Sequence, residues 1–241
     1  MPQPAGFTER PYLFTTAIML TISAAYVASG VAAAAFKLPA ALTNLIANII
    51  LAALAAVLVT RLGLWTRIGF RALPAARDLR LYWLPFSLVL INLSFGIAKT
   101  SFGQAALFLA LAASVGFVEE IAFRGLILRA IAPLGLWRAA LISSLLFGLA
   151  HSLNVLGGAN PVYTLLQVGY ALALGFAFAA LTLRTGAIWP LVIIHALIDF
   201  AGFLGSGGVT TTSVRDADFI VTAVYILTFG GFGVLMMRPK G

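Results

Sequence analysis

The chain has 241 residues, of which 62% are hydrophobic and only 9% are charged, and its mean hydropathy is +1.06. Because soluble domains carry about 25% charged residues, this composition excludes an ordinary soluble protein and is typical of an all-α polytopic membrane protein. The net charge of +8 does not indicate a nucleic-acid partner, since the basic residues lie between apolar segments, where they orient a protein in a bilayer.

Eight apolar segments are candidates for membrane-spanning helices, each of which needs about 20 residues. The predicted spans are 12–36, 38–60, 81–98, 104–132, 137–153, 161–183, 187–204 and 219–237. The first is longer than the roughly 7–15-residue apolar core of a signal peptide, so we expect it to be retained. We therefore expect one integral membrane domain over residues 1–241, with no separate soluble module.

The basic residues predict how this domain is oriented. If the N-terminus is cytoplasmic, eleven Lys and Arg residues lie on the inner side and three on the outer side, with Arg124 inside a span. The inner group is Arg10, Arg61, Arg67, Arg71, Arg77, Arg80, Arg129, Arg138, Arg184, Arg238 and Lys240, and the outer group is Lys37, Lys99 and Arg215. Such asymmetry favours cytoplasmic N- and C-termini. A composition rich in alanine and arginine points to a bacterial cytoplasmic membrane.

Residues 61–80 join the second span to the third and alternate arginines with Leu62, Trp65 and Phe70. This pattern predicts either an amphipathic segment in the cytoplasmic interface or a basic loop with a few buried anchors. Neither interpretation assigns chemistry to the segment.

The fourth span contains two adjacent acids. Glu120 and Arg124 are four residues apart with the acid first, which is the favourable order for an ion pair on a helix. Glu119 projects about 100° away and does not share that arginine equally well. The spacing therefore predicts that Glu120 is neutralised and that Glu119 is left to act as a general base.

The fifth span supplies His151, preceded one turn earlier by Phe147. A tight turn near Leu134 makes the fourth and fifth spans an antiparallel hairpin, in which Glu119 and His151 both lie about 22–26 Å from the turn. We expect this carboxylate and imidazole to meet across the hairpin. For Phe147, core packing and a specific role at the site both stay open.

The seventh span supplies His195 and Asp199, which lie on one helix face because they are four residues apart. Asp199 is expected to accept a hydrogen bond from the imidazole and to fix its tautomer. Ionisable groups are costly within a bilayer, so two histidines and three acids at this depth indicate an acid/base site.

Other hydrolytic chemistries lack their motifs. The chain has no His-Glu-x-x-His, no Gly-x-Ser-x-Gly and no phosphate-binding glycine loop with a following lysine. It also has no cysteine, which excludes disulfides, thiolate metal ligands and a cysteine nucleophile.

Three motifs occur in order: Glu-Glu-x-x-x-Arg at 119–124, Phe-x-x-x-His at 147–151 and His-x-x-x-Asp at 195–199. With these motifs the chain resembles the CPBP family of CAAX-protease and bacteriocin-processing membrane proteins. The resemblance covers residues 104–204 and implies an intramembrane endopeptidase with a four-helix catalytic core. It implies that Glu119 and His151 activate a water, that His195 and Asp199 support the oxyanion, and that Glu120, Arg124 and Phe147 support the site.

The chain departs from the CAAX enzymes at Asp199, where they have asparagine. An ionised aspartate would repel an oxyanion, so Asp199 is either protonated or orients His195, which then donates alone; we favour the second interpretation. We expect no cofactor and no metal; if the enzyme used Zn²⁺, the ligands would be Glu119, His151 and His195. The expected partners are membrane lipids and a membrane-associated peptide or protein substrate, lipid-modified or not.

Two other functions fit the sequence less well. A proton-coupled transporter would also carry intramembrane acids and histidines, but transporters usually show repeat symmetry, and here the acids and histidines of the spans cluster in the second half. A non-catalytic immunity protein that binds a peptide in the same cavity is the other alternative, although it would not need the full acid/base set.

Overall fold

The computed structural model describes residues 9–239, and within these residues all regular structure is helical. Lys240, which we counted on the inner side, and residues 1–8 lie outside this range. Seven helical segments are long and apolar enough to cross a membrane, which confirms an all-α polytopic membrane protein. The α-helices are α1 (Pro11–Phe36), α2 (Ala40–Arg61), α3 (Ala76–Leu79), α4 (Trp83–Ser94), α5 (Phe102–Glu119), α6 (Leu128–Ile131), α7 (Leu136–Ala150), α8 (Pro161–Thr185), α9 (Trp189–Ser206) and α10 (Asp216–Met237).

Shorter segments of other helical types extend some of these helices. A π-helix, η2 (Glu120–Ile127), joins α5 to α6, and 3₁₀ turns lie at η1 (Arg80–Tyr82), η3 (Ala132–Leu134) and η4 (His151–Gly157). The predicted fourth span is thus one continuous helical segment, Phe102–Leu134, made of four parts.

The third predicted span, 81–98, contains a shorter helix than expected. α4 has only 12 residues, about 18 Å of helix, against a hydrocarbon core about 30 Å thick. It ends because Gly96 adopts a positive φ of 97°, after which residues 96–101 are not helical. The amide of Ala98 donates to the carbonyl of Leu204 (2.8 Å), so this non-helical stretch is held against the end of α9.

Residues 62–75 form a loop with buried anchors instead of an amphipathic helix. Leu64 and Ile68 are buried, and the indole of Trp189 donates to the carbonyl of Ala72 (2.9 Å). Gly69 has a positive φ, and a Cβ there would collide with the carbonyl oxygen of Gly186. The loop is therefore fixed against the turn between α8 and α9.

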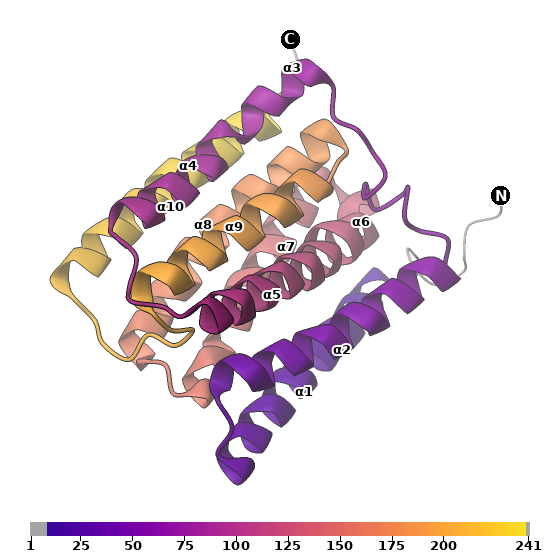
Figure 1. The fold of residues 1–241 in the computed structure, drawn as a ribbon. Helices are drawn as coiled ribbons and strands as arrows, with labels where there is room; N and C mark the ends of the chain where they lie inside the picture. The colour runs from indigo at the N-terminus through magenta and orange to yellow at the C-terminus, as the bar shows by residue number, and fades with distance from the viewer. Residues whose placement is uncertain (1–8, 240–241) are drawn as a thin grey trace.

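Both ends of the described chain lie at one end of the helix bundle (Figure 1). The loops after α2, α6 and α8, which carry or adjoin most arginines, are at the same end, whereas the loops after α1, α4 and α9 are at the opposite end. Arg184 contacts the carbonyl of Arg238 (3.1 Å), which joins α8 to the end of α10. This arrangement agrees with the predicted segregation of basic residues; which end faces the cytoplasm stays a prediction.

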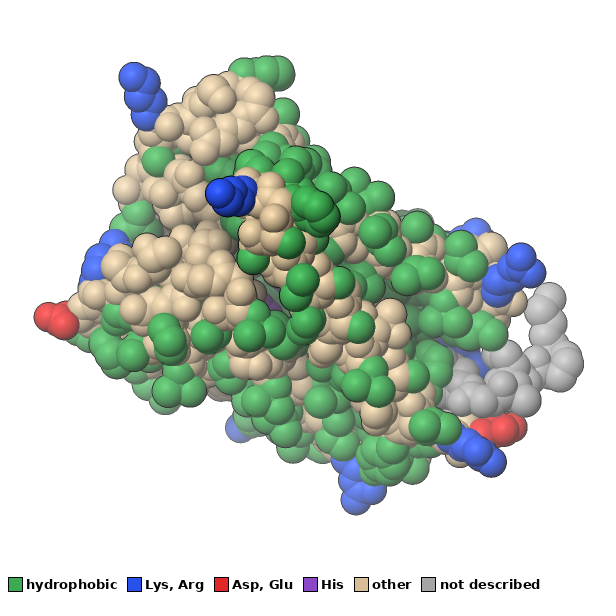
Figure 2. Space-filling model, turned by 90° about the horizontal axis from the view of Figure 1, so that it is seen from below, with side chains coloured by type: hydrophobic (Ala, Val, Ile, Leu, Met, Phe, Trp, Pro, Cys, Tyr) green, Lys and Arg blue, Asp and Glu red, His purple; other side chains and the backbone are tan. Residues whose placement is uncertain are grey.

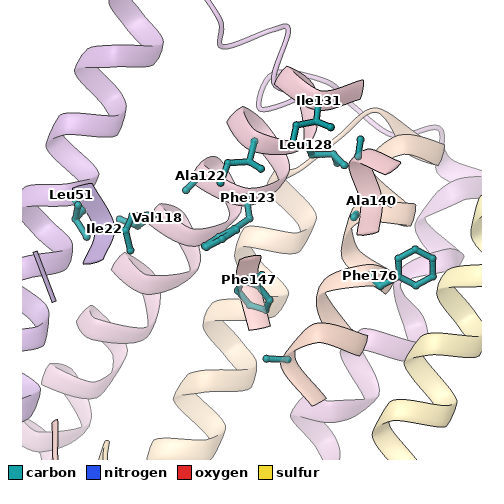
Figure 3. Close-up of a cluster of buried hydrophobic side chains, with 14 residues drawn as sticks. Ile22, Leu51, Val118, Ala122, Phe123, Leu128, Ile131, Ala140, Phe147 and Phe176 are labelled. Carbon is teal, nitrogen blue, oxygen red and sulfur yellow. The ribbon is translucent and has the colours of Figure 1, made fainter. Parts of the chain in front are cut away.

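Glycines let the core helices approach closely, as is usual in membrane bundles. A Cβ at Gly116 of α5 would lie 2.8 Å from the Val192 carbonyl oxygen of α9, and one at Gly148 of α7 would lie 2.8 Å from the Val168 carbonyl oxygen of α8. Gly175 of α8 leaves room for the side chains of Phe147 and Arg124. A buried apolar cluster runs from α1 and α2 across α5 and η2 to α7 and α8 (Figure 3).

Candidate active site

Glu120 and Arg124, the ion pair expected on the fourth span, lie in the π-helical segment η2. All eight residues of η2, including Glu120 and Arg124, are buried. The hydroxyl of Ser143, on α7, donates to the carbonyl of Phe123 at 2.7 Å and so gives this irregular backbone a partner. π-helical segments often occur at functional sites, where they redirect side chains.

Glu120 and Arg124 form the ion pair that their spacing predicts. Arg124 Nη1 lies 3.1 Å from Glu120 Oε1, and both side chains are 0% exposed. The guanidinium also lies over the ring of Phe147, 4.1 Å from its centroid, and 5.3 Å from that of Phe178. Arg124 is thus held by one carboxylate and two aromatic faces.

His195 lies between the two glutamates. Its Nδ1–H donates to Glu120 Oε1 at 2.8 Å, and its Nε2 lies 3.6 Å from Glu119 Oε2 and 3.8 Å from Asp199 Oδ2. Glu119 and Glu120 therefore approach opposite nitrogens of one ring. Glu120, and not Asp199, accepts the hydrogen bond that fixes the tautomer of His195. The expectation that Asp199 accepts this bond was therefore wrong. The reason is that α9 packs against α5 closely enough for Glu120 to reach the ring across the helix interface.

Side-chain exposure increases from the back of this cluster to the front. Glu120 and Arg124 are 0% exposed, His195 7%, Glu119 15% and Asp199 25%. Glu119 Oε2 is buried and accepts no hydrogen bond from the described residues. Of the two adjacent glutamates, Glu119 is therefore the one that has both an acceptor oxygen without a hydrogen bond and a partly exposed side chain.

His151 joins the cluster through Phe147. Its Nδ1–H donates to the Phe147 carbonyl at 2.9 Å, and the Phe147 ring lies edge-to-face with both histidines, 4.9 Å from His151 and 5.9 Å from His195. No ion pair joins His151 to Glu119 within residues 9–239, so the expected direct meeting across the hairpin is not found. The cause is local: α7 ends at Ala150, and His151 begins a 3₁₀ segment with its ring bonded back to its own helix.

Two hollows lie near the cluster. Figure 2 views the molecule from below and shows a histidine side chain at the bottom of a hollow near the middle of that face. A separate apolar cavity of about 260 Å³ lies between α1, α2 and the fourth span. Its walls include Ile22, Leu51, Val118 and Ala122, so it adjoins the backbone that carries Glu119.

The arrangement does not fit a resident zinc ion. Within residues 9–239 no group of three or more His, Asp or Glu side chains is placed to hold a metal. Of the three ligands expected for Zn²⁺, Glu119 and His195 lie together, but His151 has Nδ1 bonded to the Phe147 carbonyl and, within residues 9–239, forms no ion pair with Glu119.

The comparisons with known proteins agree with the three motifs. No curated protein matches the chain. The family model of Rce1-like type II CAAX prenyl endopeptidases matches residues 100–201, from the start of α5 into α9. This stretch contains all seven predicted site residues: Glu119, Glu120, Arg124, Phe147, His151, His195 and Asp199. The resemblance to the CAAX-protease family is thereby confirmed, and the match over residues 100–201 is to its Rce1-like type II endopeptidases.

Proposed function

We propose that this protein is an intramembrane endopeptidase in which Glu119 removes a proton from a water that attacks a peptide carbonyl. The observation that supports this most directly is the free oxygen of Glu119, buried yet adjacent to the Nε2 atom of His195 at 3.6 Å. A general base needs such an unused acceptor within one water of the reacting atoms. The family match independently supports a protease.

The second step is stabilisation of the oxyanion by His195. Because Nδ1–H is bonded to Glu120, Nε2 is the nitrogen that faces Glu119, Asp199 and the substrate. A proton on Nε2 makes the ring cationic, and the three neighbouring carboxylates offset that charge. Nε2–H then donates to the oxyanion, which Asp199 itself does not contact. This assigns Asp199 a charge-balancing role in place of the amide donor of the CAAX enzymes.

The reaction closes by proton return. Glu119 gives the proton taken from water to the departing amine, so the carboxylate is regenerated and one water is consumed for each peptide bond broken. The Nε2 atom of His151 is free for the attacking water, since Nδ1 is used by the Phe147 carbonyl. Phe147 excludes water from the Glu120–Arg124 pair behind the site.

The proposed substrate is a membrane-associated peptide or protein, lipid-modified or not. The apolar cavity beside Val118 suits an apolar portion of such a substrate, and its walls suit no nucleic acid. We propose that the protein resides in a bacterial cytoplasmic membrane with both termini cytoplasmic, on the asymmetry of its basic residues.

The test is cleavage of a peptide library, with lipid-modified and unmodified members, by the purified protein in detergent. Glu119→Gln keeps the shape of the side chain and removes the base, so its rate should fall by about 10²–10⁴. Asp216→Asn, an exposed carboxylate at the start of α10, is the matched control and should cleave normally. Cleavage by Glu119→Gln at the control rate would refute the proposal, and loss of wild-type activity in a chelator, restored by Zn²⁺, would refute the metal-free mechanism.

A further inference from the structure

The first two spans, which lie outside the matched stretch, contain a polar network within the membrane. The hydroxyl of Tyr26, on α1, donates to Asn48 Oδ1 on α2 at 3.1 Å, and Asn48 Nδ2 donates to the Asn44 carbonyl at 2.9 Å. Asn48 is 0% exposed. Polar side chains inside a span are costly, so a buried network there indicates a functional site unless packing alone explains it.

This network lies beside the catalytic cluster. Figure 3 shows Ile22, one turn before Tyr26, and Leu51, three residues after Asn48, next to Val118, which immediately precedes Glu119. Tyr26 packs against the same apolar cluster, which also includes Phe147. Phe147 in turn lies edge-to-face with the rings of both His151 and His195, so Tyr26 belongs to the apolar layer next to the catalytic cluster.

The direction of the hydrogen bonds defines what Tyr26 offers. The amide nitrogen of Asn48 is used by the Asn44 carbonyl, so its Oδ1 faces Tyr26 and accepts the hydroxyl proton. The lone pairs of the Tyr26 oxygen then remain as acceptors. An acceptor in the layer next to the catalytic cluster matches a peptide N–H, the donor that every substrate residue except proline supplies.

Packing of α1 on α2 does not by itself require this bond. The hydroxyl of Ser29 donates to Asn44 Oδ1 at 3.2 Å, which already joins the two helices one turn away. Tyr26 is also only partly buried, whereas Asn48 behind it is fully buried. A fully buried amide thus holds the side chain of a partly buried tyrosine, which is the arrangement of a positioned binding group.

We propose that Tyr26, held by Asn48, positions the substrate by accepting a hydrogen bond from one of its backbone N–H groups. This inference rests on the proposed peptidase function. It makes α1 and α2 one wall of the active site, although they lie outside the segment that matches the family.

The first test compares Tyr26→Phe with Tyr82→Phe. Both substitutions remove one hydroxyl; that of Tyr82 bonds Thr185 at 2.8 Å near the turn between α8 and α9, away from the site. Tyr26→Phe should lower kcat/KM about tenfold, mainly through KM, while Tyr82→Phe leaves both constants unchanged. A tenfold lower kcat/KM corresponds to a loss of about 1.4 kcal/mol of binding free energy. Equal kcat/KM for the two variants would overturn the inference.

The second test is decided by the wild-type protein, so it does not depend on whether a variant folds. Peptides in which one backbone N–H at a time is replaced by an ester oxygen are cleaved by the wild type. One position should show a loss of about tenfold, and Tyr26→Phe should show no such position; a wild type indifferent to every ester would overturn the inference. Loss of cleavage in Glu119→Gln, measured in parallel, shows that the peptidase itself stands. A wild type that cleaves nothing, by contrast, refutes both proposals.

Discussion

The Glu120–Arg124 pair offers the sharpest test of how the site is supported. Glu120 Oε1 is the partner of both Arg124 Nη1 (3.1 Å) and His195 Nδ1 (2.8 Å). Substituting Glu120→Gln keeps an oxygen that can accept from His195 but removes the negative charge. Arg124, which has no exposed surface and two further nitrogens without hydrogen bonds, would then be a buried, uncompensated cation.

Removing one partner of a buried ion pair costs about 3–5 kcal/mol. For a chain of this length each kcal/mol lowers the melting temperature by about 2–4 °C, so Glu120→Gln should lose about 6–20 °C. The double substitution Glu120→Gln with Arg124→Met removes the stranded charge and retains apolar volume beneath Phe147. It should recover most of that loss, because replacing both partners of a buried pair is often neutral.

The assay is thermal unfolding in one detergent, followed by circular dichroism. The control is Arg215→Gln, which removes one partner of the Arg215–Asp218 pair, where the arginine side chain is 81% exposed; exposed pairs contribute only about 0–1 kcal/mol. A melting temperature for Glu120→Gln equal to that of the control would refute the reasoning, as would a double variant no more stable than the single one.

Three further predictions concern the surroundings of the cluster. Gly175→Ala would place a Cβ 2.9 Å from Phe147 Cδ1 and 3.2 Å from Arg124 Nη2, so it should lower both melting temperature and cleavage rate; unchanged values would show that the helices have room to separate. Phe147→Leu keeps an apolar side chain but loses the ring that lies against both histidines, so cleavage should fall at least tenfold with a smaller change in melting temperature; an unaffected rate would reduce Phe147 to core packing. Ser143→Ala leaves the Phe123 carbonyl of the π-helix without its side-chain donor and should cost about 1 kcal/mol, measured by thermal unfolding; no loss would mean that the π-helix does not need this bond.

The sequence predicted seven of the eight spans and the residues that gather in the cluster, because both follow from local patterns. Apolar runs of about 20 residues define membrane helices, and ionisable groups inside them are rare enough to mark a site. The Glu120–Arg124 pair needed only the geometry of one helix. These properties depend on residues close together in the chain, so they can be predicted without knowing how the helices pack.

The contacts that were missed depend on packing between helices. The π-helix from Glu120 to Ile127 was indicated by no residue pattern. The bond from His195 to Glu120 joins residues 75 positions apart, and the spacing of His195 and Asp199 suggested a nearer partner instead. Tyr26 and Asn48 are uncharged side chains on two different apolar spans, so no local pattern in the sequence marks them as a pair. The 3₁₀ segment that begins at His151 likewise prevented the expected contact with Glu119.

The central claim is that Glu119, as the base for the attacking water, and His195, as the donor to the oxyanion, act together in one step. The direct measurement is a double-mutant cycle on kcat/KM with Glu119→Gln, His195→Gln and the double variant. Residues that act together are strongly non-additive, so the double variant should be no slower than the slower single variant, within about threefold. A double variant whose loss equals the product of the two single losses would show that the two side chains act independently, and would contradict the account.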